Sequence, residues 1–420
     1  ISQDGQTYRY LINNANFESY IKVVKVDAET GKTIPYAGAG FQIYDPAGNK
    51  VSMTFTYPTP TTIDTFYTDA DGQLVTPEKL EYGKGYSLVE VQAPYGYVLD
   101  STPVPFDVTE ENSTQEGGIT LIKVDKPNMA QKGTISVEKT GEVFFGVNVF
   151  GEKDKDVIYQ PVYTVKGLAG AVYEITADED IITPDGTLRY HKGDVVDTVT
   201  TDDEGFAKSK ELYLGKYTVV EIKAPNGMVI NNEKHSVELT YAGQDVAVTE
   251  TVTSFYNERQ KVKISLEKVL EQNDIFGIGK NDEIKNISFG LYAKEDIVSS
   301  SGTVIPADGL IEIITLDENG KATVNTDLPF GSYYIKEIAT DENYILSDIQ
   351  YPFTFEYAGQ DTETVEIKVN DSKPIENKLI YGSVSGKKID ENGEALGGAL
   401  IGIFKADETE FTKEHAIMTA

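Results

Sequence analysis

Cysteine and tryptophan are absent from the 420-residue sequence, which holds only four methionines and three histidines. Without cysteine the chain forms no disulfide, no thiolate metal site and no thiol nucleophile. The histidines, His191, His235 and His415, are far apart and lack the spacing of a zinc site or of a Ser-His-Asp triad. The sequence therefore predicts no metal site, no cofactor and no conventional active site, and a covalent cross-link would have to use other side chains.

Basic residues are also scarce, because 37 Lys and Arg stand against 68 Asp and Glu, which gives a net charge of -31. Nucleic acids and anionic membranes attract clustered Lys and Arg, so neither is an expected partner. No apolar run approaches the roughly 20 residues of a membrane span, and residues 1–20 lack the basic-then-apolar profile of a signal peptide. The hydrophobic content of 40% is nonetheless that of a folded protein.

Short runs of alternating apolar and polar residues dominate the chain, and no long stretch keeps the 3.6-residue period of a helix. Examples are YIKVVKV (20–26), SVELTY (236–241) and FTFEY (353–357), and turn-forming clusters separate such runs. The length corresponds to about three domains of roughly 100–150 residues. We therefore predict an all-β protein made of tandem sandwiches.

Long strings recur along the chain. YSLVEVQAPYGYVLD (86–100) returns as YTVVEIKAPNGMVIN (217–231) and, more loosely, as YYIKEIATDENYILS (333–347). ELTYAGQD (238–245) returns as TFEYAGQD (354–361). At four junctions an Asn precedes a strand Lys by eleven residues, and these junctions are 14–25, 128–139, 257–268 and 377–388. The chain is therefore predicted to contain internal repeats.

The junctions define the predicted domains. The complete repeats are repeat 1 (18–130), repeat 2 (131–259) and repeat 3 (260–379). Residues 1–17 are predicted to be the last strand of an upstream repeat, and 380–420 the opening strands of a truncated fourth one. Repeat 2 is the longest and carries a Phe- and Val-rich insertion near 141–166. We expect the chain to be a piece of a longer protein.

Each repeat also carries one Lys, one Glu and one Asn at similar spacing. Strand parity places Lys268 on the same face as Ile264 and Leu266, and it predicts buried positions for the other lysines and for the glutamates. A buried Lys or Glu without compensation is costly, so three matched sets require a reason. The sets are Lys25, Glu90, Asn128; Lys139, Glu221, Asn257; and Lys268, Glu337, Asn377.

Burial suggests what these side chains do. It disfavours charged forms, so the Lys tends toward a neutral amine and the Glu toward a neutral acid. A neutral amine is a nucleophile, and a protonated carboxyl can polarise the Asn amide carbonyl through a hydrogen bond. Contact between the two strands supplies the effective concentration that free amides lack. The residues therefore predict one Lys–Asn isopeptide bond per repeat, formed with loss of ammonia.

The chain contains the segments KVDAETGKTIPYAGAGFQIYD (25–45) and YSLVEVQAPYGY (86–97). They resemble the Cna B-type, or SpaA-like, domains of Gram-positive surface proteins and pilins. The second segment matches the E-box of that family, aromatic-x-Leu-x-Glu-x-x-Ala-Pro-x-Gly-Tyr. KKIDENGEALGGALIGIF (387–404) repeats the first signature, with Lys388 as its lysine. The resemblance implies a reverse-immunoglobulin, transthyretin-like (prealbumin-like) sandwich with an internal Lys–Asn or Lys–Asp isopeptide bond. It makes Lys25, Lys139 and Lys268 the amines, and Glu90, Glu221 and Glu337 the catalytic acids.

Two acceptors have rivals. Because the family also uses Asp as acceptor, Asp125 competes with Asn128 in repeat 1. In repeat 3, TETVEIKVN (362–370) echoes TETVTSFYN (249–257), which makes Asn370 a rival of Asn377. The eleven-residue spacing favours Asn128 and Asn377.

Repeat 3 also departs from the E-box, with Ala339-Thr340-Asp341 in place of Ala-Pro. Lys388 and Asn14 should stay unbonded, because each lacks its partner in this chain.

The expected function is that of a stalk or shaft segment of a Gram-positive surface protein, adhesin or pilus-like, extracellular and attached to the cell wall. Apart from one turnover per bond, no enzymatic activity is expected. The alternative is an adhesin segment that itself binds a host protein or glycan, through the insertion of repeat 2. Otherwise, host matrix proteins or glycans would bind other parts of the full protein, and this segment would be a monomer without nucleic-acid or membrane contacts.

Overall fold

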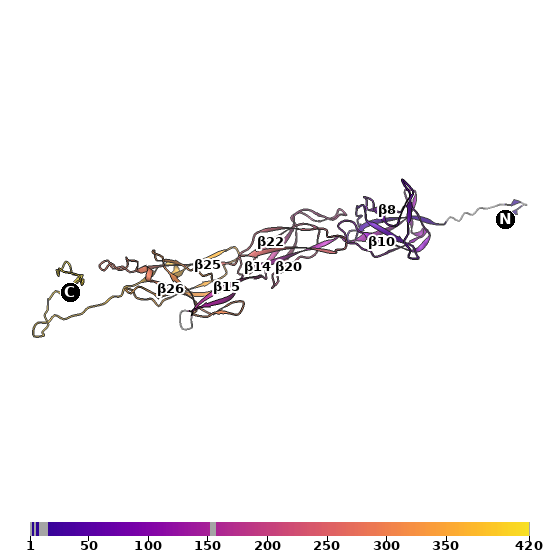
Figure 1. Cartoon of the computed structure of the whole chain (residues 1–420). Helices are drawn as coiled ribbons and strands as arrows, with labels where there is room; N and C mark the ends of the chain where they lie inside the picture. Colours follow the sequence, from indigo (N-terminus) through magenta and orange to yellow (C-terminus); the bar gives the residue numbers. More distant parts are fainter. Residues whose placement is uncertain (1, 4–5, 8–15, 152–156, 420) are drawn as a thin grey trace. The chain divides into compact units, whose positions relative to one another are not determined.

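The structure is a computed structural model that describes residues 2–3, 6–7, 16–151 and 157–419 (Figure 1). Its regular elements are strands, apart from three short 3-10 turns among the described residues, η1 (Glu110–Asn112), η2 (Glu283–Asn286) and η3 (Val369–Ser372). The predicted all-β architecture is confirmed. The described part of the chain holds no helix with the length and hydrophobicity that a membrane crossing requires.

The chain divides into two compact units. Unit 1 comprises Ile1–Thr140, Lys166–Pro225 and Ile230–Asn257, and unit 2 comprises Gly141–Val165, Asn226–Val229 and Glu258–Ala420. Most of the predicted upstream strand (1–17), including Asn14, lies outside the described residues. The described residues of 1–17 include β1 (Ser2–Gln3), which pairs antiparallel with β2 (Gln6–Thr7).

Repeat 1 forms a sandwich in unit 1. One sheet has the order β11-β10-β4-β7, and the other has the order β12-β13-β3-β8 with β9 paired to β3. Ile21 and Val23 of the second sheet meet Phe41 and Leu88 of the first in one core, because alternate side chains of a strand share a face. The strands are β3 (Glu18–Asp27), β4 (Gly40–Tyr44), β5 (Met53–Phe55), β6 (Thr61–Ile63), β7 (Phe66–Tyr67), β8 (Gln73–Val75), β9 (Leu80–Glu81), β10 (Gly83–Gln92), β11 (Val104–Val108), β12 (Ser113–Glu116) and β13 (Ile119–Asn128).

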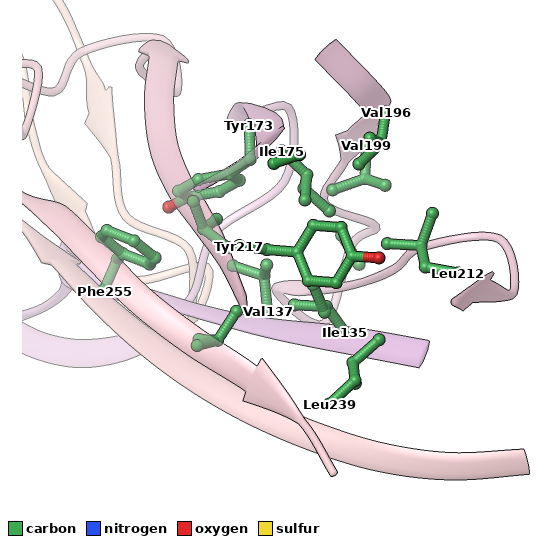
Figure 2. Packing of buried hydrophobic residues seen from close by; sticks show 14 of the residues in the cluster. Ile135, Val137, Tyr173, Ile175, Val196, Val199, Leu212, Tyr217, Leu239 and Phe255 are labelled. Carbon is green, nitrogen blue, oxygen red and sulfur yellow. The ribbon is translucent and has the colours of Figure 1, made fainter. Parts of the chain in front are cut away.

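Repeat 2 contributes a second sandwich to unit 1. The sheet β19-β16-β22-β23 faces β14, which pairs with β20, β21 and β24. Figure 2 shows Tyr173, Ile175 and Tyr217 of the first sheet pointing toward Ile135 and Val137 of β14 in the shared core. The strands are β14 (Lys132–Phe150), β16 (Val172–Ala177), β17 (Ile181–Ile182), β18 (Leu188–Tyr190), β19 (Val195–Thr200), β20 (Phe206–Lys208), β21 (Leu212–Tyr213), β22 (Gly215–Lys223), β23 (Lys234–Leu239) and β24 (Val248–Asn257).

Repeat 3 forms the sandwich of unit 2 from the sheets β29-β26-β31-β32 and β30-β25-β33, with β34 also paired to β25. Its last strand is interrupted, because η3 separates β33 from β34 and Asn370 has a left-handed φ of 59°. The strands are β25 (Lys261–Leu270), β26 (Ser288–Ala293), β27 (Ile297–Val298), β28 (Val304–Ile305), β29 (Leu310–Thr315), β30 (Lys321–Thr323), β31 (Gly331–Ala339), β32 (Gln350–Phe355), β33 (Thr364–Lys368) and β34 (Ile375–Asn377).

The insertion of repeat 2 has a structural role within unit 2. β15 (Ile158–Gly167) forms its second half and pairs in parallel with β29 through Ile158 and Leu310. Phe144, Val147 and Tyr159 pack against the core of unit 2. These three side chains are used in packing, whereas Val149, Phe150 and Val165 of the same insertion are exposed.

Residues 380–419 contain one two-stranded sheet, β35 (Gly402–Ile403) with β36 (Met418–Thr419). Most of their side chains are exposed, and Lys388 is among these.

The first and last strands of each repeat are neighbours. β3 and β13 are parallel, with Lys25 opposite Lys126, and β25 is parallel to β33 and β34, with Leu270 opposite Asn377. β14 likewise pairs with β24. Parallel neighbours require a long connection, which here is the rest of the sandwich. This topology brings residues that are more than 100 positions apart into contact.

Candidate functional site

Each repeat contains one buried cluster that brings together the predicted Lys, Glu and Asn. The lysines lie on the first strands, the glutamates on β10, β22 and β31 of the facing sheet, and the asparagines at the ends of β13, β24 and β34. The clusters are Lys25–Glu90–Asn128, Lys139–Glu221–Asn257 and Lys268–Glu337–Asn377. The Lys Nζ lies 2.9, 3.2 and 3.3 Å from the Glu Oε1 in repeats 1, 2 and 3, and all six side chains have 0% exposure. The three Lys–Glu pairs are therefore buried and differ from ion pairs on a solvated face.

Each glutamate also accepts a hydrogen bond from the amide nitrogen of its asparagine. The Asn Nδ2 lies 2.7 Å from Glu90 Oε2, 2.9 Å from Glu221 Oε2 and 2.8 Å from Glu337 Oε1. In repeats 2 and 3 the lysine Nζ also donates to the asparagine Oδ1, at 2.5 Å in repeat 3. The carboxyl thus contacts both the amine and the amide nitrogen, which are the two groups that exchange in a transamidation.

An Asp-x-x-Gly turn holds the backbone of each lysine, because the glycine carbonyl accepts the lysine N–H. The three pairs are Lys25–Gly72 at 2.9 Å, Lys139–Gly205 at 2.7 Å and Lys268–Gly320 at 2.7 Å. A Cβ on Gly320, whose φ is +74°, would lie 2.2 Å from the Lys268 carbonyl oxygen. Only glycine fits such a position. This contact between the turns and the lysines was not predicted from the sequence.

Burial lowers the pKa of all three lysines, because removal from water disfavours the charged amine. For Lys25 the desolvation is opposed by the paired glutamate and assisted by the charge of Lys126, and its pKa falls to about 8. Desolvation also lowers the pKa of Lys139 and of Lys268. A phenylalanine ring adjoins each amine, with its centroid 5.8–6.0 Å from Nζ. The amines are therefore closer to the neutral, nucleophilic form than an exposed lysine.

Repeat 1 contains a second buried lysine that was missed when the three repeats were compared in sequence. Lys126 is 1% exposed, and its Nζ donates to Asp100 Oδ2 at 2.8 Å and to a backbone carbonyl at 3.0 Å. Its own carbonyl accepts the Lys25 Nζ at 2.9 Å, and Asn128 Oδ1 has no hydrogen-bond partner among the described residues. Strand parity carried a signal, because Lys126 shares the face of Asn128 and takes the position of Phe255 in repeat 2.

Among the described residues, neither rival acceptor forms a hydrogen bond or ion pair with Lys25 or Lys268. Asp125 is half exposed and pairs with Lys123 Nζ at 3.0 Å. Asn370 lies in η3, and its Nδ2 donates to a backbone carbonyl in its own turn at 3.1 Å. The amides that contact Glu90 and Glu337 belong to Asn128 and Asn377, the two residues that the eleven-residue spacing favours.

The fold and the clusters define a class of tandem β-sandwiches that carry a buried Lys, Glu and Asn. A family model described as "SpaA: Prealbumin-like fold domain" matches residues 19–123, 161–253 and 276–373. The chain belongs to this family, which confirms the resemblance seen in its motifs and the prealbumin-like sandwich that it implied. Each match falls within one of the predicted repeats.

The chain is similar to proteins of Streptococcus and Bacillus. The trypsin-resistant surface T6 protein of Streptococcus pyogenes is 27% identical over 139 residues, which are 32% of this chain and 24% of that protein. The TIE protein of Bacillus anthracis has 20% identity and a TM-score of 0.49, over 86% of this chain and 51% of that chain. BcpA, the major pilin subunit of Bacillus cereus, has 18% identity and a TM-score of 0.30, over 86% and 99% of the two chains. The chain thus spans about a quarter of the T6 protein and about half of the TIE protein.

Proposed function

We propose that the chain is a shaft segment of a Gram-positive cell-surface protein, adhesin or pilus-like, in which each repeat is cross-linked by a self-made Lys–Asn isopeptide bond. The observation that carries the proposal is the buried cluster, present three times, in which one carboxyl contacts both the amine and the amide. Membership of the SpaA family and the similarity to a streptococcal surface protein support a location outside the cell, attached to the cell wall.

The bond forms from the three side chains alone. The neutral Lys Nζ attacks the Asn Cγ, and the Glu carboxyl takes a proton from the amine and delivers it to the amide nitrogen. The bond between Cγ and Nδ2 then breaks, ammonia leaves, and a secondary amide joins the two side chains. The Glu recovers its starting protonation state, so the step needs no further reactant. Each cluster reacts once and acts on no external substrate.

The location of the bond suits a segment that carries tension. In repeat 1 the bond would join two parallel neighbouring strands, β3 and β13, which are the first and last of the sandwich. Force entering by one strand would leave by the other without extending the residues between them. The bond would also restrict the unfolded chain, and a disulfide that closes a loop of about 100 residues stabilises by about 4–5 kcal/mol on the same entropic grounds.

The intact mass of the fully denatured protein tests this proposal. We expect a mass lower than that of the sequence by three ammonia molecules, because each cluster reacts once. Lys25→Ala, Lys139→Ala and Lys268→Ala should each restore one of them. An unshifted wild-type mass would refute isopeptide formation, whereas loss of water in place of one ammonia would identify Asp125 as the acceptor of repeat 1.

A further inference from the structure

The repeated Tyr-Ala-Gly-Gln-Asp string forms a loop that contacts the preceding repeat. In unit 1 this docking loop (residues 241–246) lies against the segment 93–100 of repeat 1. Gln244 Oε1 accepts the Ala93 N–H at 2.9 Å, and the Gln244 carbonyl accepts the Leu99 N–H at 2.9 Å. The ring of Tyr241 lies 4.6 Å from that of Tyr95. The Tyr241 hydroxyl also donates to the Tyr97 carbonyl at 3.4 Å. Three hydrogen bonds and a ring contact therefore connect the docking loop of repeat 2 to repeat 1.

A buried glutamine holds the docking loop in place. Gln131 is 1% exposed, and its Nε2 donates to the carbonyls of Gly243 at 2.8 Å and Val246 at 2.5 Å. Its Oε1 accepts the Ala242 N–H at 2.8 Å, and its own N–H donates to the Gly96 carbonyl at 2.8 Å. Gln131, which lies three residues after Asn128, thus binds both the docking loop and the segment 93–100.

The segment 93–100 in turn orients the reactive groups of repeat 1. The Val98 carbonyl accepts the Asn128 Nδ2 at 2.6 Å, and the Asp100 N–H donates to Glu90 Oε2 at 3.1 Å. Val98 also donates its N–H to the Met129 carbonyl at 3.0 Å. Movement of this segment would displace both the acceptor amide and the carboxyl that must exchange protons with it.

The same arrangement of glutamine and loop recurs in unit 2. Gln260 is fully buried, and its Nε2 donates to the carbonyls of Gly359 at 3.1 Å and Thr362 at 2.7 Å. Its Oε1 accepts the Ala358 N–H at 2.8 Å. Tyr357 donates its hydroxyl to the Met228 carbonyl at 3.0 Å, as Tyr241 reaches the segment 93–100 in unit 1. The recurrence argues for a built-in contact and against a chance one.

We propose that the docking loop of one repeat positions the isopeptide acceptor of the repeat before it, with Gln244 as the positioning residue for Asn128. The inference rests on the proposed isopeptide chemistry and adds that docking of repeat 2 precedes efficient formation of the bond in repeat 1. Docking limits the motion of the segment 93–100, so the Asn128 amide spends more time in the reactive orientation beside Glu90. The bond of repeat 1 therefore reaches its full rate only after repeat 2, which is synthesised later, has folded and docked.

Gln244→Met in the full chain tests the proposal, because methionine keeps the length of the side chain and cannot accept the Ala93 N–H. The full chain is pulse-labelled during cell-free synthesis, denatured at intervals and digested, and the three cross-linked peptides are quantified by mass spectrometry. We expect the Lys25–Asn128 bond to form about two- to tenfold more slowly, as loss of one hydrogen bond to a buried donor implies. The bonds of repeats 2 and 3 should form at their wild-type rates.

Two matched variants complete the experiment. Gln244→Glu retains an oxygen acceptor and should restore the rate of the first bond. Asp245→Ala alters the same loop at a residue without a hydrogen bond or ion pair among the described residues, and should change no rate. An unchanged first bond in Gln244→Met, or an equal delay of all three bonds, would overturn the inference. A wild-type chain without any cross-linked peptide would instead refute the isopeptide proposal itself.

Discussion

Replacing Glu221 by glutamine should abolish the isopeptide bond of repeat 2 and make that repeat the first part of the chain to unfold. The carboxyl lies 3.2 Å from Lys139 Nζ and 2.9 Å from Asn257 Nδ2, so it can move a proton between the two nitrogens. Glutamine occupies the same space but cannot accept the proton. One ammonia fewer should be lost, and the two remaining bonds should be unaffected.

The loss of stability has two sources. The absent cross-link should cost about 4–5 kcal/mol if it acts as a disulfide closing a loop of this length does. The unreacted Lys139 would also remain buried without its partner, which typically costs about 3–5 kcal/mol. Asn257→Ala separates the two, because it removes the acceptor and leaves the Lys139–Glu221 pair. We expect Asn257→Ala to be destabilised less than Glu221→Gln.

Guanidinium unfolding and intact mass, measured on the same samples, provide the test. Glu238→Gln is the matched control, since Glu238 is exposed on β23 of the same repeat and lies outside the cluster. It should keep all three ammonia losses and wild-type stability. A Glu221→Gln protein that still loses three ammonia molecules would show that the carboxyl is not required for the reaction.

The clusters were predictable because they depend on two properties that a sequence expresses directly. Strand alternation assigns each residue to a face, so that Lys25 falls with Ile21 and Val23. Internal repetition then distinguishes a recurring buried charge from an accidental one. The same parity could have separated the rival acceptors of repeat 1, because Asp125 and Asn128 are three residues apart and lie on opposite faces of β13.

Other features depended on tertiary contacts that the sequence does not express. The Tyr-Ala-Gly-Gln-Asp string was visible, but its contact with the segment 93–100 arises only when two sandwiches meet. Lys126 has no counterpart in the other repeats, so repetition gave no signal for it. The sequence did not decide the role of the insertion near 141–166, because its Phe and Val residues suit an exposed ligand surface and a packed hairpin equally well. Which of these it forms depends on whether a neighbouring sheet covers it, as the core of unit 2 does for Phe144 and Val147.

An Asn128→Ala variant should acquire a pH-dependent stability in repeat 1 that the wild-type chain lacks. The variant keeps Lys25 as a free amine, and burial holds its pKa at about 8 in the folded state against 10.5 in the unfolded chain. Between these two values the unfolded chain binds more protons, so the free energy of unfolding rises with pH. From pH 8 to pH 9.5 the rise should be about 1.5 kcal/mol, given about 1.4 kcal/mol per pH unit at full slope.

Proteolytic cleavage within residues 18–130 at increasing urea concentrations measures this stability, because repeats 2 and 3 keep their bonds and repeat 1 unfolds first. The wild-type chain and a Lys25→Met/Asn128→Ala double variant are the controls. In the first the proposed bond turns the Lys25 nitrogen into an amide, and in the second the amine is absent, so neither should titrate at this position. Other groups, such as Tyr97 with its raised pKa, contribute equally to all three proteins and cancel in the comparison. If Asn128→Ala and the double variant respond to pH identically, Lys25 remains charged in the folded state, and burial alone does not produce the nucleophilic amine that the cross-link requires.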